Sequence, residues 1–246
     1  MSRLVILSGP SCVGKSPLQK ALAKFHPDLA KQLCAPVLYN CREPRPGEVD
    51  GVAYHFRPRE YLESLRGKPG YLVMDVRNDI QALAMADVQA VLECGQDAFF
   101  EGNAYVATAL MDAPELAGVP KLSVFLAPLS GDEIREIDQH APGQVARIVT
   151  DAMRRKLLRR TQKQKGILSL RDLEDIEARC AAAWREMAHA WRFDHVLPNH
   201  DGEDSENWDA FYYPLGDARK CLQDFVAALK GEGTAWAERW EEGLAG

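Results

Sequence analysis

The sequence lacks a long hydrophobic run and any excess of positive charge. No segment approaches the roughly 18 consecutive apolar residues that a membrane span needs, and the apolar run at the start is too short for a signal peptide. Lys and Arg total 30 against 36 Asp and Glu, which gives a formal net charge of −6. We therefore expect a cytoplasmic protein that binds neither membranes nor nucleic acid through charge, so any positive site must be local.

The sequence also lacks the cysteine patterns of disulfide scaffolds and zinc sites. Its six cysteines form no C-x-x-C pair, and we expect reduced, mostly buried thiols. There is no internal repeat and no low-complexity segment. The 246 residues are enough for a single domain with a conventional core. A monomer and a homodimer both remain open.

Short buried-type runs alternate with amphipathic segments along most of the chain. We predict strands over residues 3–7, Tyr71–Val76, Asp97–Gly102, Lys121–Ala127 and 194–199, and helices over Lys15–Phe25, 86–94, 105–111 and Gly216–Lys230. Strands that alternate with helices indicate an α/β fold, in which a mainly parallel sheet is covered by helices on both faces.

The pattern changes to long, charged helices over residues 149–191. Gly166 offers a helix stop and Ser169 a new N-cap, so this region is predicted to form a helical hairpin. Residues 200–209 are polar enough to be a loop, and the tail over 234–246 is predicted to form a short helix. Trp236 and Trp240 in that tail are expected to pack on the body or on a neighbouring chain.

The stretch GPSCVGKS follows a predicted strand and opens a helix, which is the context in which G-x-x-x-x-G-K-[ST] binds phosphate. Its glycines let backbone N–H groups turn toward the β-phosphate, and the helix N-terminus adds its positive dipole end. Lys15 would bridge the β- and γ-phosphates, and the Ser16 hydroxyl would ligate Mg²⁺. Pro17 fits the first helical turn, where its missing N–H is not needed. The predicted ATP-binding residues of this loop are Gly9, Ser11, Cys12, Val13, Gly14, Lys15, Ser16 and Pro17.

A carboxylate at the end of a neighbouring strand commonly assists magnesium binding in such proteins. Glu101, which closes DAFFE, is the best placed by sequence. We therefore predict a magnesium site formed by Ser16 and Glu101.

A second loop, CREPRPGEVDGVAYHF, brings two arginines close together among proline and glycine. Guanidinium groups bind phosphate oxygens bidentately, so Arg42 and Arg45 are candidates to converge on one anion. Tyr54 would add a hydroxyl donor. The alternative is a pair of solvated loop arginines.

The two motifs together resemble guanylate kinase, in which a P-loop is followed by an R-x-P-R-x-G-E-x-x-G-x-x-Y-x-F segment that grips the phosphate of GMP. The segment WREMAHAWRFDHVLPN is also similar to the lid-exit helix and the following strand of that family. The resemblance implies one P-loop NTPase-type domain, with a core over 1–36, 86–148 and 185–230. It further implies an acceptor-binding subdomain over 37–85, a helical lid over 149–184 and a C-terminal tail over 231–246.

The same resemblance implies roles for individual residues. Arg42, Arg45 and Tyr54 would hold the phosphate of the acceptor, and Asn199 would lie near the adenine of ATP. The family places lid arginines against the transferring phosphoryl group, and the candidates here are Arg159, Arg160, Arg171 and Arg179. The predicted catalytic set is these four with Lys15 and Arg42, and the predicted cofactors are ATP and Mg²⁺.

The positions that read guanine in that family are altered. Leu38 replaces a serine, Cys41 replaces a threonine, and Val73 or Met74 stands at the place of a glutamate. RNDIQAL replaces GxxYG(T/S), and a D-x-D strand end becomes Glu101 and Asn103. Buried polar partners lost in this way cost about 1 to 3 kcal/mol each, so GMP is doubtful as the acceptor. The predicted acceptor-binding residues are Leu38, Arg42, Arg45, Tyr54, Asp75, Arg77, Gln81, Glu101 and Asn103.

Three functional hypotheses follow from these residues. The first is ATP-dependent phosphoryl transfer to the phosphate of a nucleoside monophosphate. The second is a kinase for another phosphorylated small molecule. The third is a non-catalytic guanylate-kinase-like binding module, which the intact Gly9, Gly14, Lys15 and Ser16 disfavour.

Overall fold

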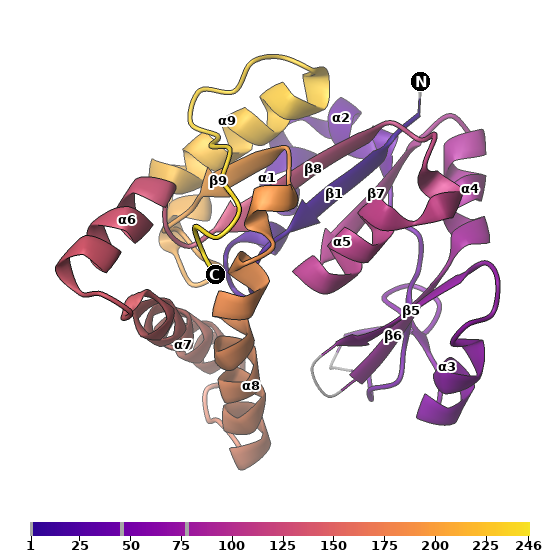
Figure 1. Ribbon diagram of the computed structural model, residues 1–246, viewed down its shortest axis with the longest axis horizontal. Coiled ribbons are helices and arrows are strands. Elements are labelled where there is room, and N and C mark those ends of the chain that lie inside the picture. Colours follow the sequence, from indigo (N-terminus) through magenta and orange to yellow (C-terminus); the bar gives the residue numbers. More distant parts are fainter. Residues whose placement is uncertain (1, 45–46, 77–78) are drawn as a thin grey trace. The chain divides into compact units, whose positions relative to one another are not determined.

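The structure is a computed structural model that describes residues 2–44, 47–76 and 79–246 (Figure 1). The chain forms two compact units. The first contains residues up to Ile6, Gln32–Glu101 and Tyr105–Lys121, and the second contains Leu7–Lys31, Gly102–Ala104 and Leu122–Gly246. The larger sheet has the strand order β2-β7-β1-β8-β9, with parallel pairing between β2 and β7 and between β8 and β9. The predicted α/β class with a mostly parallel central sheet is confirmed.

The strands are β1 (Leu4–Ser8), β2 (Leu33–Cys34), β3 (Tyr39–Asn40), β4 (His55–Phe56), β5 (Tyr71–Val76), β6 (Asp79–Ala84), β7 (Asp97–Gly102), β8 (Lys121–Ala127) and β9 (His195–Pro198). The helices are α1 (Lys15–Phe25), α2 (Pro27–Gln32), α3 (Arg59–Leu65), α4 (Met85–Glu93), α5 (Ala104–Asp112), α6 (Gly131–His140), α7 (Val145–Lys165), α8 (Leu170–Met187) and α9 (Gly216–Lys230). Short 3₁₀ turns cover Pro114–Leu116, Ala190–Arg192 and Glu206–Trp208.

The first unit holds a small second sheet of order β4-β3-β6-β5. β5 and β6 pair antiparallel, and β3 pairs antiparallel with β6 and parallel with β4. Helix α3 covers one face of this sheet through a cluster formed by Leu62, Leu65, Ile80 and Ala82. The opposite face carries other side chains, because successive residues of a strand point to opposite sides.

The helical hairpin of the second unit was predicted and is confirmed. Helices α7 and α8 lie side by side (Figure 1), and α7 ends at Gly166, which has φ +75°. Ser169 begins α8 with a reciprocal cap, since its hydroxyl accepts from the Asp172 N–H while the Asp172 carboxylate accepts from the Ser169 N–H. The sequence signals for a stop and a new start were therefore sufficient here.

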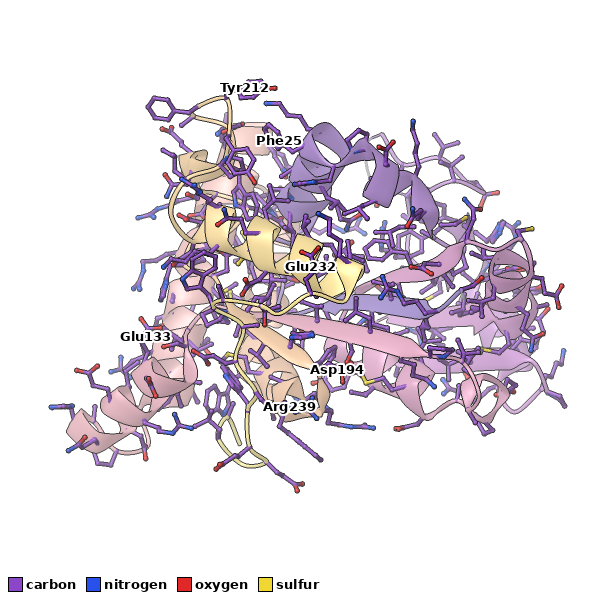
Figure 2. All side chains as sticks on the ribbon, turned by 90° about the horizontal axis from the view of Figure 1, so that it is seen from above. Phe25, Glu133, Asp194, Tyr212, Glu232 and Arg239 are labelled. Carbon is purple, nitrogen blue, oxygen red and sulfur yellow. The ribbon has the colours of Figure 1, made fainter. Side chains whose placement is uncertain are left out.

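Two expectations differ from the structure. Residues 79–84 form strand β6, which was not among the strands predicted from the sequence. The tail is extended rather than helical, because Glu238 exchanges backbone hydrogen bonds of 2.8 Å with Val196 of β9. Trp240 of the tail is buried, Trp236 is half-exposed, and Arg239 lies 3.5 Å from Asp194 (Figure 2). Pairing with a sheet edge outweighed the helical pattern of the tail.

The cysteines are less uniformly buried than the sequence analysis expected. Cys12, Cys180 and Cys221 are buried, Cys34 and Cys41 are half-buried, and Cys94 is exposed. Among the residues that the structure describes, no helix is long and apolar enough to cross a membrane.

Asp224 anchors the C-terminal tail, and its replacement by Ala is expected to destabilise the protein. The side chain on α9 is 2% exposed and accepts from the Ala235 N–H at 2.9 Å and the Trp236 N–H at 2.8 Å. Loss of two hydrogen bonds to a carboxylate should lower the free energy of unfolding by about 2 to 3 kcal/mol, measured by urea denaturation. The exposed Asp209→Ala is the matched control, with a change of about 0.5 kcal/mol or less. Equal effects in the two variants would contradict this role.

Candidate functional site

The loop between β1 and α1 has a backbone that few residues other than glycine can adopt. Gly9 has φ +136°, and a Cβ there would lie 2.3 Å from the Leu126 carbonyl oxygen. Gly14 has φ +110°, and a Cβ there would lie 2.4 Å from the Asn199 Nδ2. Cys12 also has a positive φ, of 69°. Ser11, Cys12 and Val13 thus form a tight turn that requires both flanking glycines.

The carbonyl groups of this loop are held by specific donors. Lys15 is 6% exposed, and its Nζ donates to the Gly9 oxygen at 2.7 Å and the Pro10 oxygen at 2.9 Å. The Cys12 oxygen accepts from the Glu203 N–H at 3.2 Å, and the Val13 oxygen accepts from the Asn199 Nδ2 at 2.7 Å. These hydrogen bonds, together with one of 3.3 Å from the Val13 N–H to the Pro10 oxygen, fix the backbone of the turn in a conformation typical of anion-binding loops. The loop therefore fits the phosphates of a nucleotide, with Ser16 and Pro17 in the first turn of α1.

Asn199 is fully buried beside this loop. Its Nδ2 also donates to the Asp201 oxygen at 2.9 Å, and its Oδ1 accepts from the Asp201 N–H at 3.0 Å. The side chain thus supports the phosphate loop from β9, and a contact with adenine stays a prediction.

Cys12 is an unreactive member of the loop. Burial, with the negative charge of Glu203, raises the pKa of the Cys12 thiol to about 12, although Arg160 acts in the opposite direction. A thiol with this pKa is protonated at neutral pH, so it cannot serve as a nucleophile.

The predicted magnesium ligands lie in different units. Ser16 is exposed at the start of α1 in the second unit, and Glu101 is half-buried at the end of β7 in the first. Asn103 follows Glu101 by two residues and is also half-buried. The described residues contain no group of three or more His, Cys, Asp or Glu side chains arranged to hold a metal. Mg²⁺ bound with a nucleotide does not need such a group, because it takes one or two protein ligands together with phosphate oxygens and water.

Arg42 is held in a defined position in the first unit. Its Nη1 and Nη2 donate to the two carboxylate oxygens of Glu48 at 2.6 and 2.7 Å. The guanidinium carbon lies 5.1 Å from the ring centre of Tyr54 and 5.4 Å from that of Phe56. Burial acts to lower the pKa of Arg42, but the hydrogen bonds and charge of Glu48 outweigh it and raise the pKa. Arg42 is therefore a permanent cation with a fixed planar fork, as bidentate phosphate binding requires.

The strand register shows which side chains share a face with Arg42. Asn40 pairs with Gln81, and Gln81 pairs with Met74, so these three lie in one row across the small sheet. Phe56 pairs with Asn40 from β4, which places the row beside the ring that Arg42 contacts. This face, defined by Arg42, Asn40, Phe56, Met74 and Gln81, is called the acceptor face below.

Two of the altered guanine-reading candidates, Cys41 and Val73, and several predicted acceptor residues lie elsewhere. Cys41 and Val73 pack on the α3 side, where the Cys41 sulfur accepts from the Ile80 N–H at 3.0 Å. Asp75 also lies on that side and pairs with Arg66 at 3.0 Å. Leu38 is half-buried, and its oxygen accepts from the His55 N–H. Arg45 and Arg77 lie outside the described residues.

The four lid arginines have different surroundings in the second unit. The Arg160 guanidinium lies 2.9 Å from Glu203, and both side chains are largely buried. Arg179 is also buried and pairs with Asp175 on the same helix. Arg159 is mostly exposed, 3.8 Å from Asp204, and Arg171 is exposed. Of the four, Arg160 pairs with Glu203, the residue whose N–H donates to the Cys12 oxygen of the phosphate loop.

Two carboxylates at the site, Glu48 and Glu203, were not predicted from the sequence. Glu48 lies within the quoted R-x-P-R-x-G-E motif, so its spacing from Arg42 was a usable signal. Glu203 belongs to a polar stretch with no recognised motif, and nothing in the sequence indicated its contacts.

A glycine-rich loop closed by a lysine, set between a buried strand and a helix in an α/β fold, defines a P-loop protein. Residues 1–155 match the family model described as guanylate kinase. The chain is 30% identical over 204 residues to a guanylate kinase of Ruegeria sp. (strain TM1040), an alignment that covers 82% of this chain and 79% of the relative. It is 32% identical over 199 residues to a guanylate kinase of Alkalilimnicola ehrlichii, covering 80% and 81% respectively.

The fold also has a counterpart among solved structures. The crystal structure of guanylate kinase from Anaplasma phagocytophilum superposes with a TM-score of 0.55 at 16% identity, covering 94% of this chain and 85% of that one. The chain belongs to the guanylate kinase family.

Proposed function

We propose that the protein transfers the γ-phosphoryl group of ATP to the phosphate of a nucleoside monophosphate. The observation that carries this proposal is the fork of Arg42, held by Glu48 beside Tyr54 and Phe56, in a chain with an intact P-loop. A P-loop alone is compatible with many nucleotide-dependent activities. A phosphorylated acceptor needs a second phosphate-binding site, separate from the P-loop, and Arg42, held in a fixed position, can supply it.

The donor would be held by the second unit. The backbone of the phosphate loop and the N-terminus of α1 would receive the β-phosphate. Lys15 would leave the Gly9 and Pro10 oxygens to neutralise charge on the transferring group. Ser16, with Glu101 as a further candidate, would hold Mg²⁺, which when bound neutralises charge on the β- and γ-oxygens. Arg160, and the more exposed Arg159 and Arg171, are the proposed lid cations.

The acceptor would be held by the first unit through Arg42, Tyr54 and Arg45. Its phosphate oxygen is already a nucleophile at neutral pH, so the reaction needs positioning and charge neutralisation rather than a general base. Gln81 and Met74 on the acceptor face would contact the remainder of the acceptor.

The experiment that tests this function is a coupled ATP-consumption assay across ribo- and deoxynucleoside monophosphates. We expect one or a few acceptors to raise ADP formation at least about tenfold above the rate with ATP alone. Binding of Mg-ATP without stimulation by any monophosphate would contradict nucleoside-monophosphate kinase activity. Failure to bind Mg-ATP would instead favour a non-catalytic binding module.

A second candidate function is phosphorylation of another phosphorylated small molecule. Cys41, at one of the altered base-reading positions, packs on the α3 side and favours this candidate because it cannot read a base there. Sugar phosphates added to the same assay separate the two candidates.

Met74→Glu is expected to increase selectivity for GMP. Met74 lies on the acceptor face next to Gln81, and a carboxylate there accepts from the two adjacent N–H donors of guanine. Because one such readout contributes about 1 to 3 kcal/mol, we expect kcat/KM for GMP to rise about tenfold relative to other monophosphates.

Val73→Glu is the matched control for Met74→Glu. It places the same charge one residue away, on the α3 side, so it should destabilise the protein without any gain in GMP selectivity. A folded Met74→Glu variant with unchanged selectivity would contradict the assignment of the acceptor face.

A further inference from the structure

The segment between β9 and α9, residues 200–215, is a built structure rather than a solvated loop. Asp201 accepts from the Ser205 hydroxyl and the Asn207 amide, and also from the backbone N–H groups of Asp217 and Ala218, at 2.8 to 3.1 Å. The Trp208 indole N–H donates to the backbone carbonyl oxygens of Asp201 and Gly202. One half-buried carboxylate thus ties the segment to the first turn of α9. We call residues 200–215 the buttress loop.

The far end of the buttress loop is fixed on α1. The Phe25 ring packs against those of Tyr212 and Tyr213, with ring centres 5.5 and 4.7 Å apart, and the side chains of Phe25 and Tyr212 lie close together in Figure 2. The Lys24 ammonium donates to the backbone carbonyl oxygen of Tyr212 at 3.2 Å. One end of the buttress loop is therefore anchored on α9, and the other on α1, the helix that follows the phosphate loop.

The buttress loop contacts the phosphate loop closely at Gly202 and Glu203. The Glu203 N–H donates to the Cys12 oxygen at 3.2 Å, and a Cβ on Gly202 would lie 2.4 Å from that same oxygen. Glycine at 202 is required because no side chain fits between the two backbones.

Residues 200–204 of the buttress loop also contact helix α7. The Glu203 carboxylate pairs with the Arg160 guanidinium at 2.9 Å, with side chains 16% and 18% exposed, and Lys156 donates to the His200 oxygen at 2.5 Å. Asp204 is 7% exposed and faces Arg159 and Lys156 at 3.8 and 4.0 Å. Glu203 therefore joins the phosphate loop, through its N–H, to Arg160 of the helical hairpin, through its carboxylate.

Two buried polar atoms at this contact, one on Arg160 and one on the neighbouring Asp204, make no hydrogen bond to the described residues. Among the described residues, no group accepts from the buried Arg160 Nε–H, and none donates to the buried Asp204 Oδ1. An unpaired buried polar group costs about 1 to 3 kcal/mol, and more when it is charged. The Arg160 guanidinium therefore has an N–H donor that a phosphate oxygen of a ligand could bind.

We propose that Glu203 is a positioning residue that holds Arg160 against the phosphate loop, where Arg160 binds the phosphates of the donor nucleotide. This inference rests on the proposed function only in that the donor is Mg-ATP, and it does not depend on the acceptor. The opposite possibility is that Glu203 masks Arg160 and competes with the nucleotide. The two predict changes of opposite sign when the charge of Glu203 is removed.

The test measures Mg-ATP affinity by calorimetry in the full chain, for the unaltered protein, Glu203→Gln, Arg160→Gln and the double variant. Glutamine keeps the size of Glu203 and an acceptor oxygen, so folding should survive. If Glu203 positions Arg160, Glu203→Gln should lower the affinity for Mg-ATP about tenfold, and Arg160→Gln should lower it by more. Positioning also predicts that Glu203→Gln has no further effect when Arg160 is already Gln, because it acts through that residue.

Control variants and melting temperatures separate positioning from a general structural effect. Glu206 is exposed in the same loop, and Glu206→Gln should leave the affinity for Mg-ATP unchanged. Arg160→Lys keeps the positive charge and should retain part of that affinity. If Glu203→Gln weakens Mg-ATP equally in the Arg160→Gln background, its role is structural and the proposal fails. Unchanged or tighter binding in the single variant also overturns it. If the unaltered protein does not bind Mg-ATP, the proposed function fails as well, and this outcome is distinct from the others.

Discussion

Lys15→Met is expected to lower the rate of phosphoryl transfer by about a thousandfold or more, with a much smaller effect on stability. Removing one preorganised donor at a developing charge typically costs a factor of about 10² to 10³, and Lys15 also supplies a full positive charge. The ammonium is buried against the Gly9 and Pro10 oxygens, so its loss should lower the free energy of unfolding by about 1 to 3 kcal/mol. Methionine is unbranched and only one atom shorter than lysine, so it fills most of the same space. Steady-state kinetics and a melting curve measure the two effects.

The control for Lys15→Met lies on the same helix. Lys20 is exposed on α1, and Lys20→Met should change neither the rate nor the melting temperature appreciably. Turnover in Lys15→Met within tenfold of the unaltered protein would remove the P-loop lysine from the mechanism.

Arg42→Met is expected to raise KM for the acceptor about a hundredfold while the affinity for Mg-ATP stays the same. The guanidinium is preorganised by Glu48 and by the rings of Tyr54 and Phe56, so little entropy is lost when it binds phosphate. Loss of a hydrogen-bonded charge from a mostly buried site costs about 2 to 5 kcal/mol, and each 1.4 kcal/mol is about tenfold. Acceptor titrations at saturating ATP measure the change.

Arg57→Met is the matched control in the same unit. Arg57 is half-exposed and pairs with Asp50 at 3.0 Å, a kind of surface pair that contributes about 1 kcal/mol or less. Its replacement should leave the acceptor KM nearly unchanged. A similar rise in KM for both variants would indicate a general electrostatic effect rather than a specific phosphate contact.

The sequence predicted most elements whose signals are local. Residues Tyr71–Val76, Asp97–Gly102 and Lys121–Ala127 are strands with the predicted bounds, and Lys15–Phe25 is the predicted helix. Buried runs bounded by turn residues and amphipathic runs with clear starts determine such elements without help from distant contacts. The P-loop was predictable for the same reason, since its glycines and Lys15 act within a single turn.

Features that depend on partners distant in the chain were not predictable. The pairing of β6 with β5 decides that Met74 faces Gln81 while Val73 faces α3, and without that register both remained candidates. The tail pairs with Val196 from 42 residues away in sequence, counted from Glu238. Glu203 meets Arg160 across 43 residues, and no local pattern encodes that contact.

The most direct test of the account follows the γ-phosphate itself. The protein is incubated with ATP labelled in the γ position and with the acceptor that most stimulates ATP consumption, and the products are separated. We predict that the label appears in a nucleoside diphosphate, on the phosphate added to the acceptor. At limiting acceptor, Lys15→Met should lower its appearance about a thousandfold or more and Arg42→Met about a hundredfold. Label found only as free inorganic phosphate, or label transfer that persists in Lys15→Met, would contradict the account.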